Sequence, residues 1–182
     1  MALNLALQAE HVSSDGDCFF ESIVAQFSDH WRRRKLPGRL TIALQRYWIA
    51  QFFQNPKKAR PALQIWEQLY RENPRNPEFS FMREVLQHRQ PLVLIQNLVT
   101  KNSFWANDLA IQVIADNLAR LFKEQVSIVL LRQGNPGDTT TITSSCLGVP
   151  PLPVLVTYLH YKPGQHFQPL TVHGSRLFEK RR

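Results

Sequence analysis

Apolar residues recur at helical spacing along the first two thirds of the chain and give way to short β-type runs in the last third. After Cys18, large apolar side chains return every three or four residues as far as Trp31. This spacing predicts a helix that begins at or next to Cys18 and buries one stripe of its surface. The Ser, Asp and Gly residues just before Cys18 supply turn and capping groups. The same spacing predicts further helices over residues 39–54, 61–73, 77–88 and 106–122.

Three runs rich in β-branched and aromatic residues follow these helices and predict strands over residues 126–132, 154–161 and 166–172. The turn "KPGQ" at residues 162–165 joins the last two strands into a hairpin. The stretch "TTTITSS" at residues 139–145 is predicted to be a loop, because Thr and Ser cluster there after Gly and Pro. Helices followed by a small sheet indicate an α+β fold.

The length and cysteine content indicate one compact domain over residues 1–182 in a reducing compartment. A chain of 182 residues that is 43% hydrophobic can bury a core of its own. The two cysteines, Cys18 and Cys146, form neither a disulfide framework nor a metal-binding pair, so both are expected to be free thiols. Such thiols favour the cytoplasm, or the host cytosol for a secreted effector. The basic C-terminus is also compatible with a domain excised from a longer protein.

Membrane and nucleic-acid partners are both disfavoured. No run approaches the roughly 18 apolar residues of a membrane span, and "MALNLALQAEHV" lacks the basic region of a signal peptide. The net charge of +8 could indicate nucleic acid. However, the densest basic clusters, "WRRRK" and "EKRR", resemble a solvated helix end and a tail. A basic nucleic-acid-binding module is therefore the weakest of the functional alternatives.

Cys18 has the sequence context of a nucleophile. A helix N-terminus carries free N–H groups and partial positive charge, which favour a thiolate and lower the pKa of a cysteine. The same groups, with those of the preceding turn at Asp15, Gly16 and Asp17, could bind the oxyanion formed when a thiolate attacks a carbonyl. Gly16 has no side chain to block that approach. The alternative is that Cys18 is a small apolar filler beneath a capped helix.

Acyl transfer by a thiol needs a histidine as general base, and the chain offers six. His30 and His88 lie on charged helical faces, and His11 flanks the turn before Cys18. His160 lies within an apolar strand, where a core or edge role is the usual one. His166 opens a strand directly after a Pro-Gly turn, where a side chain on a rigid element can face a cleft.

Three separated stretches, in order along the chain, resemble the ovarian tumour (OTU) family of cysteine proteases. "DGDCFFESI" is similar to the cysteine motif of that family, and "VLVTYLHYKPGQHFQPL" is similar to its histidine motif. "FWANDLAIQVIA" resembles the Trp-containing helix start that precedes the sheet. The resemblance covers nearly the whole chain. It implies a papain-related fold with helices packed around a small central β-sheet.

The same resemblance implies a deubiquitinase that cleaves isopeptide or peptide bonds after the C-terminus of ubiquitin. Its partners would be ubiquitin, polyubiquitin chains or a related modifier, and no cofactor or metal ion is implied. Cys18 would be the nucleophile and His166 the general base, with Trp105 packed beside the histidine end of the site. Gly16 and Asp17 would lend backbone N–H groups to the oxyanion. Cys146 would be incidental.

The third member of the site departs from the family pattern. Many members carry Asp or Asn two residues after the histidine, where this chain has Gln168. An amide can accept from the imidazole but brings no negative charge. Others use the aspartate three residues before the cysteine, here Asp15, which we favour because a carboxylate also stabilises the imidazolium. A turn-forming or helix-capping role for Asp15 is compatible with either assignment.

An inactive ubiquitin-binding domain of the same fold is the main alternative function, because fold and activity can separate. The presence of both Cys18 and His166 argues against it. The helical insert over residues 51–101, rich in Arg and Gln, is expected to be either an extra contact for ubiquitin or a structural lid over the core.

Overall fold

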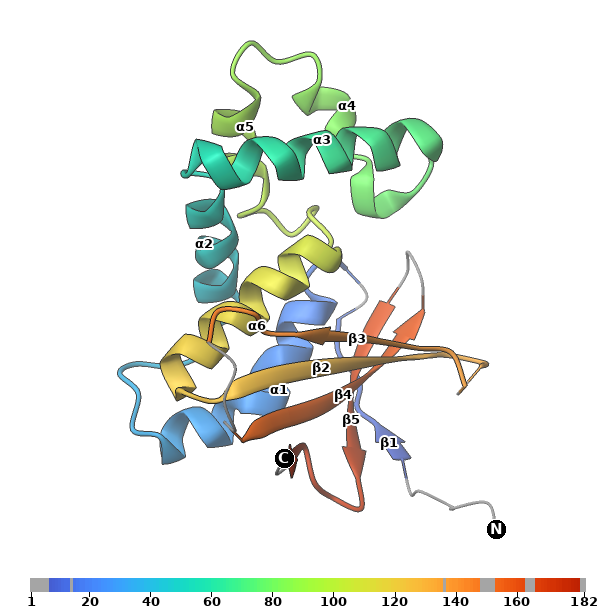
Figure 1. Cartoon of the computed structure of the whole chain (residues 1–182). Helices are drawn as coiled ribbons and strands as arrows, with labels where there is room; N and C mark the ends of the chain where they lie inside the picture. The colour runs from blue at the N-terminus through green and yellow to red at the C-terminus, as the bar shows by residue number, and fades with distance from the viewer. Residues whose placement is uncertain (1–6, 14, 136, 148–152, 163–165, 181–182) are drawn as a thin grey trace.

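The computed structural model describes residues 7–13, 15–135, 137–147, 153–162 and 166–180. It confirms the α+β class, with a helical half followed by a mixed sheet (Figure 1). The helices are α1 (Cys18–Arg33), α2 (Ile42–Phe52), α3 (Pro56–Glu72), α4 (Met82–Val85), α5 (Pro91–Leu98) and α6 (Asp108–Phe122), with a short 3₁₀ turn at Pro77–Phe79. The strands are β1 (Leu7–Ala9), β2 (Gln125–Arg132), β3 (Thr139–Thr143), β4 (Val154–Lys162), β5 (His166–Val172) and β6 (Leu177–Lys180).

The strands pair in the order β1-β5-β4-β2-β3, and β6 pairs with β4 beside this path. Only the β2–β4 pair is parallel among the described strands. The second half of β4 pairs with β5 as far as Leu159 opposite Pro169, while its first half pairs with β6 from Thr157 opposite Leu177. Beyond Pro169, β5 pairs with β1 instead. Strands β4 and β5 therefore diverge at a fork.

Helices α1 and α6 pack on the sheet. Helices α3, α4 and α5 form a helical lobe beyond α6, away from the strands, and α2 connects the lobe to the rest of the fold (Figure 1). The apolar stripe predicted after Cys18 is buried, and Phe27 of α1 stacks on Phe122 of α6 with ring centroids 6.0 Å apart. Aromatic contacts through Trp66, Phe81 and Phe104 connect the lobe to the segment before α6. The helical lobe is thus packed against the same core as the sheet.

Several elements differ from the sequence prediction. The predicted loop "TTTITSS" contains β3, because Ile142 pairs opposite Ile128 and both are buried. The predicted helix over residues 77–88 is divided into the 3₁₀ turn and the short α4, and α5 was not predicted. Helix α3 begins at Pro56, five residues earlier than expected, because the Asn55 side chain accepts a hydrogen bond from the Lys57 N–H. The predicted C-terminal tail includes Glu179 and Lys180, which are part of β6.

Strands β4 and β5 are antiparallel, with Lys162 opposite His166, as expected for a hairpin. Residues 163–165 of the predicted turn lie outside the described residues. Within the described ranges, none of the helices has the length and apolar character needed to cross a bilayer.

Gln26 of α1 occupies the fork between β4 and β5. Its amide group donates to the carbonyl of Tyr158 on β4 (3.1 Å) and to that of Leu170 on β5 (2.7 Å). Its Oε1 accepts from Arg176, which also pairs with Glu10. The side chain is only 1% exposed, so these carbonyls have little access to water. Gln26 therefore supplies the donors that the diverging strands no longer give each other.

We expect Gln26→Leu to lower the free energy of unfolding by about 2–4 kcal/mol, because the buried Leu170 carbonyl loses its donor at about 1–3 kcal/mol and the part-buried Tyr158 carbonyl at about 1 kcal/mol. Urea denaturation would measure the change. The matched control is Gln64→Leu on the exposed face of α3, which should stay within about 0.5 kcal/mol of the wild type. Equal stability of the two variants would contradict a structural role for Gln26 at the fork.

Candidate active site

The turn before α1 is built by the side chain of Asp15. Its Oδ1 accepts from the Asp17 N–H and from the Ser13 hydroxyl, both at 2.9 Å. The Cys18 N–H donates to the Asp15 main-chain carbonyl at 3.2 Å. The hydrogen bond from the Asp17 N–H is the leading cause that lowers the pKa of Asp15. Asp15 is exposed and ionised, and it has the turn-forming contacts that the sequence allowed for.

Gly16 lies where the turn before α1 and the segment before α6 approach each other closely. A Cβ atom at this position would lie 1.9 Å from the Asn102 carbonyl oxygen and 2.9 Å from that of Phe104. No side chain fits there unless the backbone of this segment moves. The sequence suggested that Gly16 lacks a side chain so that a substrate can approach. The described contacts give another reason, because the segment before α6 crosses the turn at this point and leaves no space for a Cβ atom.

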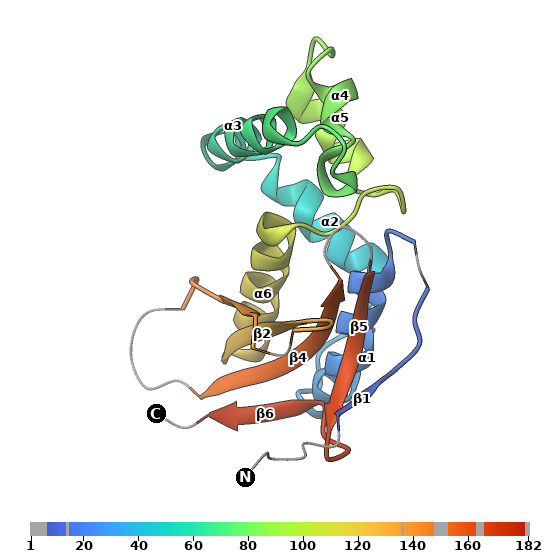
Figure 2. The ribbon, with the colours of Figure 1, turned by 90° about the vertical axis from the view of Figure 1, so that its right-hand side faces the viewer.

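Cys18 is the first residue of α1, and the start of this helix lies next to the start of β5 (Figure 2). The Cys18 Sγ accepts a hydrogen bond from the Phe167 N–H at 3.4 Å. The Phe167 ring packs edge-on against Phe19 with centroids 5.2 Å apart. His166 immediately precedes Phe167 at the first position of β5. The fold therefore brings the thiol and the predicted base into the same small region.

The pKa of the Cys18 thiol is raised, whereas the sequence predicted that it would be lowered. Burial is the main cause, since the residue is only 1% exposed. The N–H groups of Phe167 and Phe19 oppose the rise, and the negative charges of Asp15 and Glu21 add to it. The N–H group of Phe19 at the start of α1 does lower the pKa of the thiol, but the loss of hydration on burial raises this pKa by more.

The pKa of the His166 imidazole is lowered, first by burial and then by the neighbouring His11, while the charge of Glu21 opposes the shift. A neutral imidazole at neutral pH is the form that can accept a proton. Its Nδ1 is buried and makes no hydrogen bond to the described part of the chain. The directions of both pKa shifts favour a neutral thiol at Cys18 and a neutral imidazole at His166, the residue next to the Phe167 N–H that binds the sulfur.

Neither predicted third member bonds to His166 within the described residues. Gln168 follows two positions later on the same face of β5 and is paired with His160 of β4. Asp15 directs Oδ1 to Asp17 and Ser13. Neither side chain therefore provides a hydrogen-bond partner for the Nδ1 atom of His166.

Of the remaining predicted residues, Trp105 lies near the turn before α1 and Cys146 lies elsewhere. Trp105 is half-buried against the core and directly follows Phe104, whose carbonyl crosses Gly16. This places Trp105 on the side of the cysteine turn, and no described contact joins it to His166. Cys146 lies on another part of the molecule, where its thiol donates to the Asp116 carbonyl at 3.2 Å.

Glu21 and Arg46 were not predicted from the sequence as site residues. Glu21 accepts from the Ser13 N–H at 2.9 Å and from its hydroxyl at 2.7 Å, and its charge reaches both Cys18 and His166. Its position three residues after Cys18, on the same side of a helix, was the available signal. Arg46 pairs with Asp17 from α2, and no local pattern indicates that contact.

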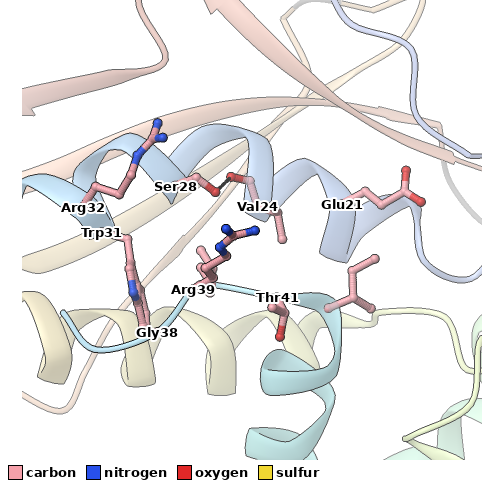
Figure 3. Close-up of a pocket in the computed structure, with 10 residues that line it drawn as sticks. Glu21, Val24, Ser28, Trp31, Arg32, Gly38, Arg39 and Thr41 are labelled. Atoms are coloured by element: carbon pink, nitrogen blue, oxygen red, sulfur yellow. Dashed lines mark hydrogen bonds between the residues drawn. The ribbon is translucent and has the colours of Figure 1, made fainter.

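A pocket of about 690 Å³ lies along the outer side of α1 (Figure 3). Glu21 lines its end nearest to Cys18, and Trp31 and Arg39 line it farther along. Neither Cys18 nor His166 is among its lining residues. This apolar hollow therefore lies next to the candidate site without including the predicted nucleophile or base. The described residues also include no group of three His, Cys, Asp or Glu side chains that could hold a metal ion.

Comparison with known proteins identifies the fold. No protein-family model matches the sequence, and neither does any curated protein. Among solved structures, an OTU domain in complex with ubiquitin superimposes with a TM-score of 0.60 at 15% sequence identity, over 97% of this chain and 76% of that one. The chain has the OTU fold.

Two further OTU structures match with lower scores. An OTU deubiquitinase from Wolbachia pipientis wMel has a TM-score of 0.46 and 16% identity, over 91% of this chain and 88% of that one. The viral OTU domain protease from Dera Ghazi Khan virus has a TM-score of 0.40 and 17% identity, over 91% of this chain and 81% of that one.

The electrostatics of the site predict how Cys18 reacts with iodoacetamide. In a Cys146→Ala background, we expect the alkylation rate of Cys18 to keep rising above about pH 8.5, the ordinary pKa of a thiol, because burial disfavours the thiolate. Mass spectrometry of the labelled peptide would give the rate, and the urea-denatured protein would give the unshifted titration. A rate that levels off below neutral pH would instead indicate a preformed thiolate–imidazolium pair.

Proposed function

We propose that this protein is a thiol-dependent deubiquitinase in which Cys18 is the nucleophile and His166 the general base. The observation that carries the proposal is the hydrogen bond from the Phe167 N–H to the Cys18 Sγ, which joins the start of α1 to the start of β5. A thiol at a helix start beside a neutral histidine is an arrangement suited to acyl transfer. The OTU fold, and the ubiquitin bound to one of the structures that share it, support ubiquitin as the substrate.

In the proposed reaction His166 takes the proton of the Cys18 thiol as the sulfur attacks the carbonyl carbon at the C-terminus of ubiquitin. The new S–C bond produces a tetrahedral oxyanion, and the C–N bond to the leaving amine then breaks. The imidazolium gives its proton to that amine. Water, activated by the neutral imidazole, hydrolyses the thioester and restores the thiol. Because thiol and histidine begin neutral, the proton moves during the attack.

The backbone N–H groups of Gly16 and Asp17 are our proposed donors to the oxyanion. In the structure the Asp17 N–H donates to Asp15 Oδ1 at 2.9 Å. For this donor to serve the reaction, the Asp15 carboxylate shares it or moves aside when substrate is bound. Oxyanion donors act best when they are already held in place, because they then need no reorganisation during the reaction.

Asp15 is our proposed third member of the site, in preference to Gln168. Its charge is close enough to Cys18 to raise the pKa of the thiol. An imidazolium that forms beside that thiol would be stabilised by the same charge, which an amide cannot provide. Trp105 is proposed to pack at the edge of the site, since its loop crosses the cysteine turn.

The helical lobe is a proposed additional contact for ubiquitin. Its surface exposes large apolar side chains, with Ile65 at 58%, Leu69 at 38% and Val93 at 57% relative exposure. Exposed apolar groups on neighbouring helices are suited to protein binding. A related modifier with a similar C-terminus would meet the same surfaces.

The alternative function is a ubiquitin-binding domain that does not cleave. It is favoured by one observation, the absence of any described hydrogen-bond partner for the His166 Nδ1. A ubiquitin whose C-terminus carries an electrophile separates the two functions. Covalent capture at Cys18 supports the enzyme, and tight binding without capture supports the alternative.

We expect Cys18→Ala and His166→Ala each to abolish hydrolysis of a fluorogenic ubiquitin C-terminal amide, since nucleophile and base act as a unit. Circular dichroism would verify that both variants fold. Cys146→Ala is the matched control and should keep the activity of the wild type, because its thiol is engaged elsewhere. Turnover that survives in Cys18→Ala would refute the assignment.

Substitutions at Asp15 separate its two roles. Asp15→Ala should reduce turnover on the order of a hundredfold or more, the loss seen when the carboxylate that orients a histidine is removed, and Gln168→Ala should reduce it only modestly. Asp15→Asn keeps an Oδ1 acceptor for the Asp17 N–H and removes the charge. Steady-state rates, with ubiquitin binding measured in parallel, would distinguish them. Full activity in Asp15→Asn would reduce the role of Asp15 to building the turn.

A further inference from the structure

Arg46 of α2 is a buried cation that the proposed chemistry does not use. The residue is only 3% exposed, and its guanidinium lies over the Phe20 ring with Cζ 4.2 Å from the centroid. Burial lowers its pKa from a very high ordinary value, while Asp17 opposes the change. Placing a charge in this position is costly unless it is fully hydrogen-bonded. The reason for the charge must therefore lie in its contacts.

All three guanidinium nitrogens of Arg46 are hydrogen-bonded. On one side, Nε and Nη2 donate to the Asp17 carboxylate at 3.1 and 2.5 Å, and Nη2 also donates to the Gly16 carbonyl at 3.2 Å. On the other side, Nη1 donates to the Val99 carbonyl at 3.0 Å, and Nη1 and Nη2 both donate to that of Phe104 at 3.3 Å. One side chain thus joins the cysteine turn, the segment before α6 and α1.

These contacts converge where the two backbones are closest. The carbonyl of Phe104, which Arg46 binds, is one of the atoms that leaves no space for a Cβ on Gly16. Arg46 donates to carbonyl groups from both segments at this crossing, those of Gly16 and Phe104. The planar fork of an arginine can serve several acceptors at once, whereas a lysine offers one point charge.

We propose that Arg46 is a positioning residue that holds the Asp15–Cys18 turn, and with it the backbone donors to the oxyanion, against the segment of residues 99–107. This inference rests on the proposed acyl transfer at Cys18, but it does not depend on ubiquitin as the substrate. Arg46 touches no reacting atom. It acts by fixing the carbonyl of Gly16 and the carboxylate of Asp17, so that the N–H groups of the turn keep their direction.

The test compares two reactions of Cys18 in folded Arg46→Lys. Hydrolysis of p-nitrophenyl acetate passes through an oxyanion, whereas alkylation by iodoacetamide does not. We expect the Cys18-dependent esterase rate to fall on the order of tenfold to a hundredfold, as for a displacement of about 1 Å in an active site, with the alkylation rate unchanged. On a ubiquitin substrate kcat should fall and KM stay the same. Arg71→Lys, at the exposed Arg71–Glu67 pair, is the matched control and should alter neither reaction.

Asp17→Asn is the second variant and decides the matter if Arg46→Lys does not fold. The Asp17 side chain is more exposed than that of Arg46, and the substitution weakens the same contact from the other partner. A parallel fall of esterase and alkylation rates, an unchanged esterase rate, or a wild type without Cys18-dependent esterase activity would each overturn the inference. A wild type that hydrolyses the ester in an Arg46-dependent manner and leaves ubiquitin substrates intact would refute the proposed function and support the role of Arg46.

Discussion

Burial of the first turn of α1 is the constraint on which the rest of the site depends. The turn is enclosed by β5, through the Phe167 N–H, and by the segment before α6, through the carbonyls that cross Gly16. Residues that are far apart in the chain pack together in this region and exclude water from it. The exclusion of water also removes the solvation that would stabilise a thiolate or an imidazolium. The proximity of Cys18 and His166 and their shifted pKa values therefore have the same cause.

Buried backbone carbonyls explain why two long polar side chains reach into the core. Where β4 and β5 diverge, Gln26 supplies the donors that the ladder lacks. Where the segment before α6 passes the cysteine turn, Arg46 supplies them. In both places an apolar residue of similar size would fill the space and leave acceptors unpaired. One of these side chains fixes α1 relative to the strands, and the other fixes the turn that precedes α1.

Local pattern predicted those parts of the fold whose determinants are close in the sequence. The helix after Cys18 and the strands over β2, β4 and β5 follow from apolar spacing and β-branched runs. Strand β3 was predicted as a loop because its Thr residues are polar, and only pairing with β2 makes it a strand. The resemblance to OTU proteases indicated Cys18 and His166. No local signal indicated Arg46, whose hydrogen-bond partners lie on two segments distant in the chain, the turn before α1 and residues 99–104, and include backbone carbonyls.

The direction of the Cys18 pKa shows why position in a helix was not sufficient evidence for an activated thiol. A helix N-terminus stabilises a nearby anion by about 0.3–1 kcal/mol at an exposed site and by up to about 2 kcal/mol at a partly buried one, which is at most roughly one and a half pKa units at about 1.4 kcal/mol each. Full burial can move a pKa by about 3–5 units. When both act on one sulfur, burial prevails, and the resting thiol stays protonated. Such a site cannot rely on a preformed thiolate. In the proposed reaction the nucleophile would be generated at the moment of attack, which would need the neutral imidazole of His166 to take the proton and the Asp17 N–H to be released by Asp15 to the oxyanion.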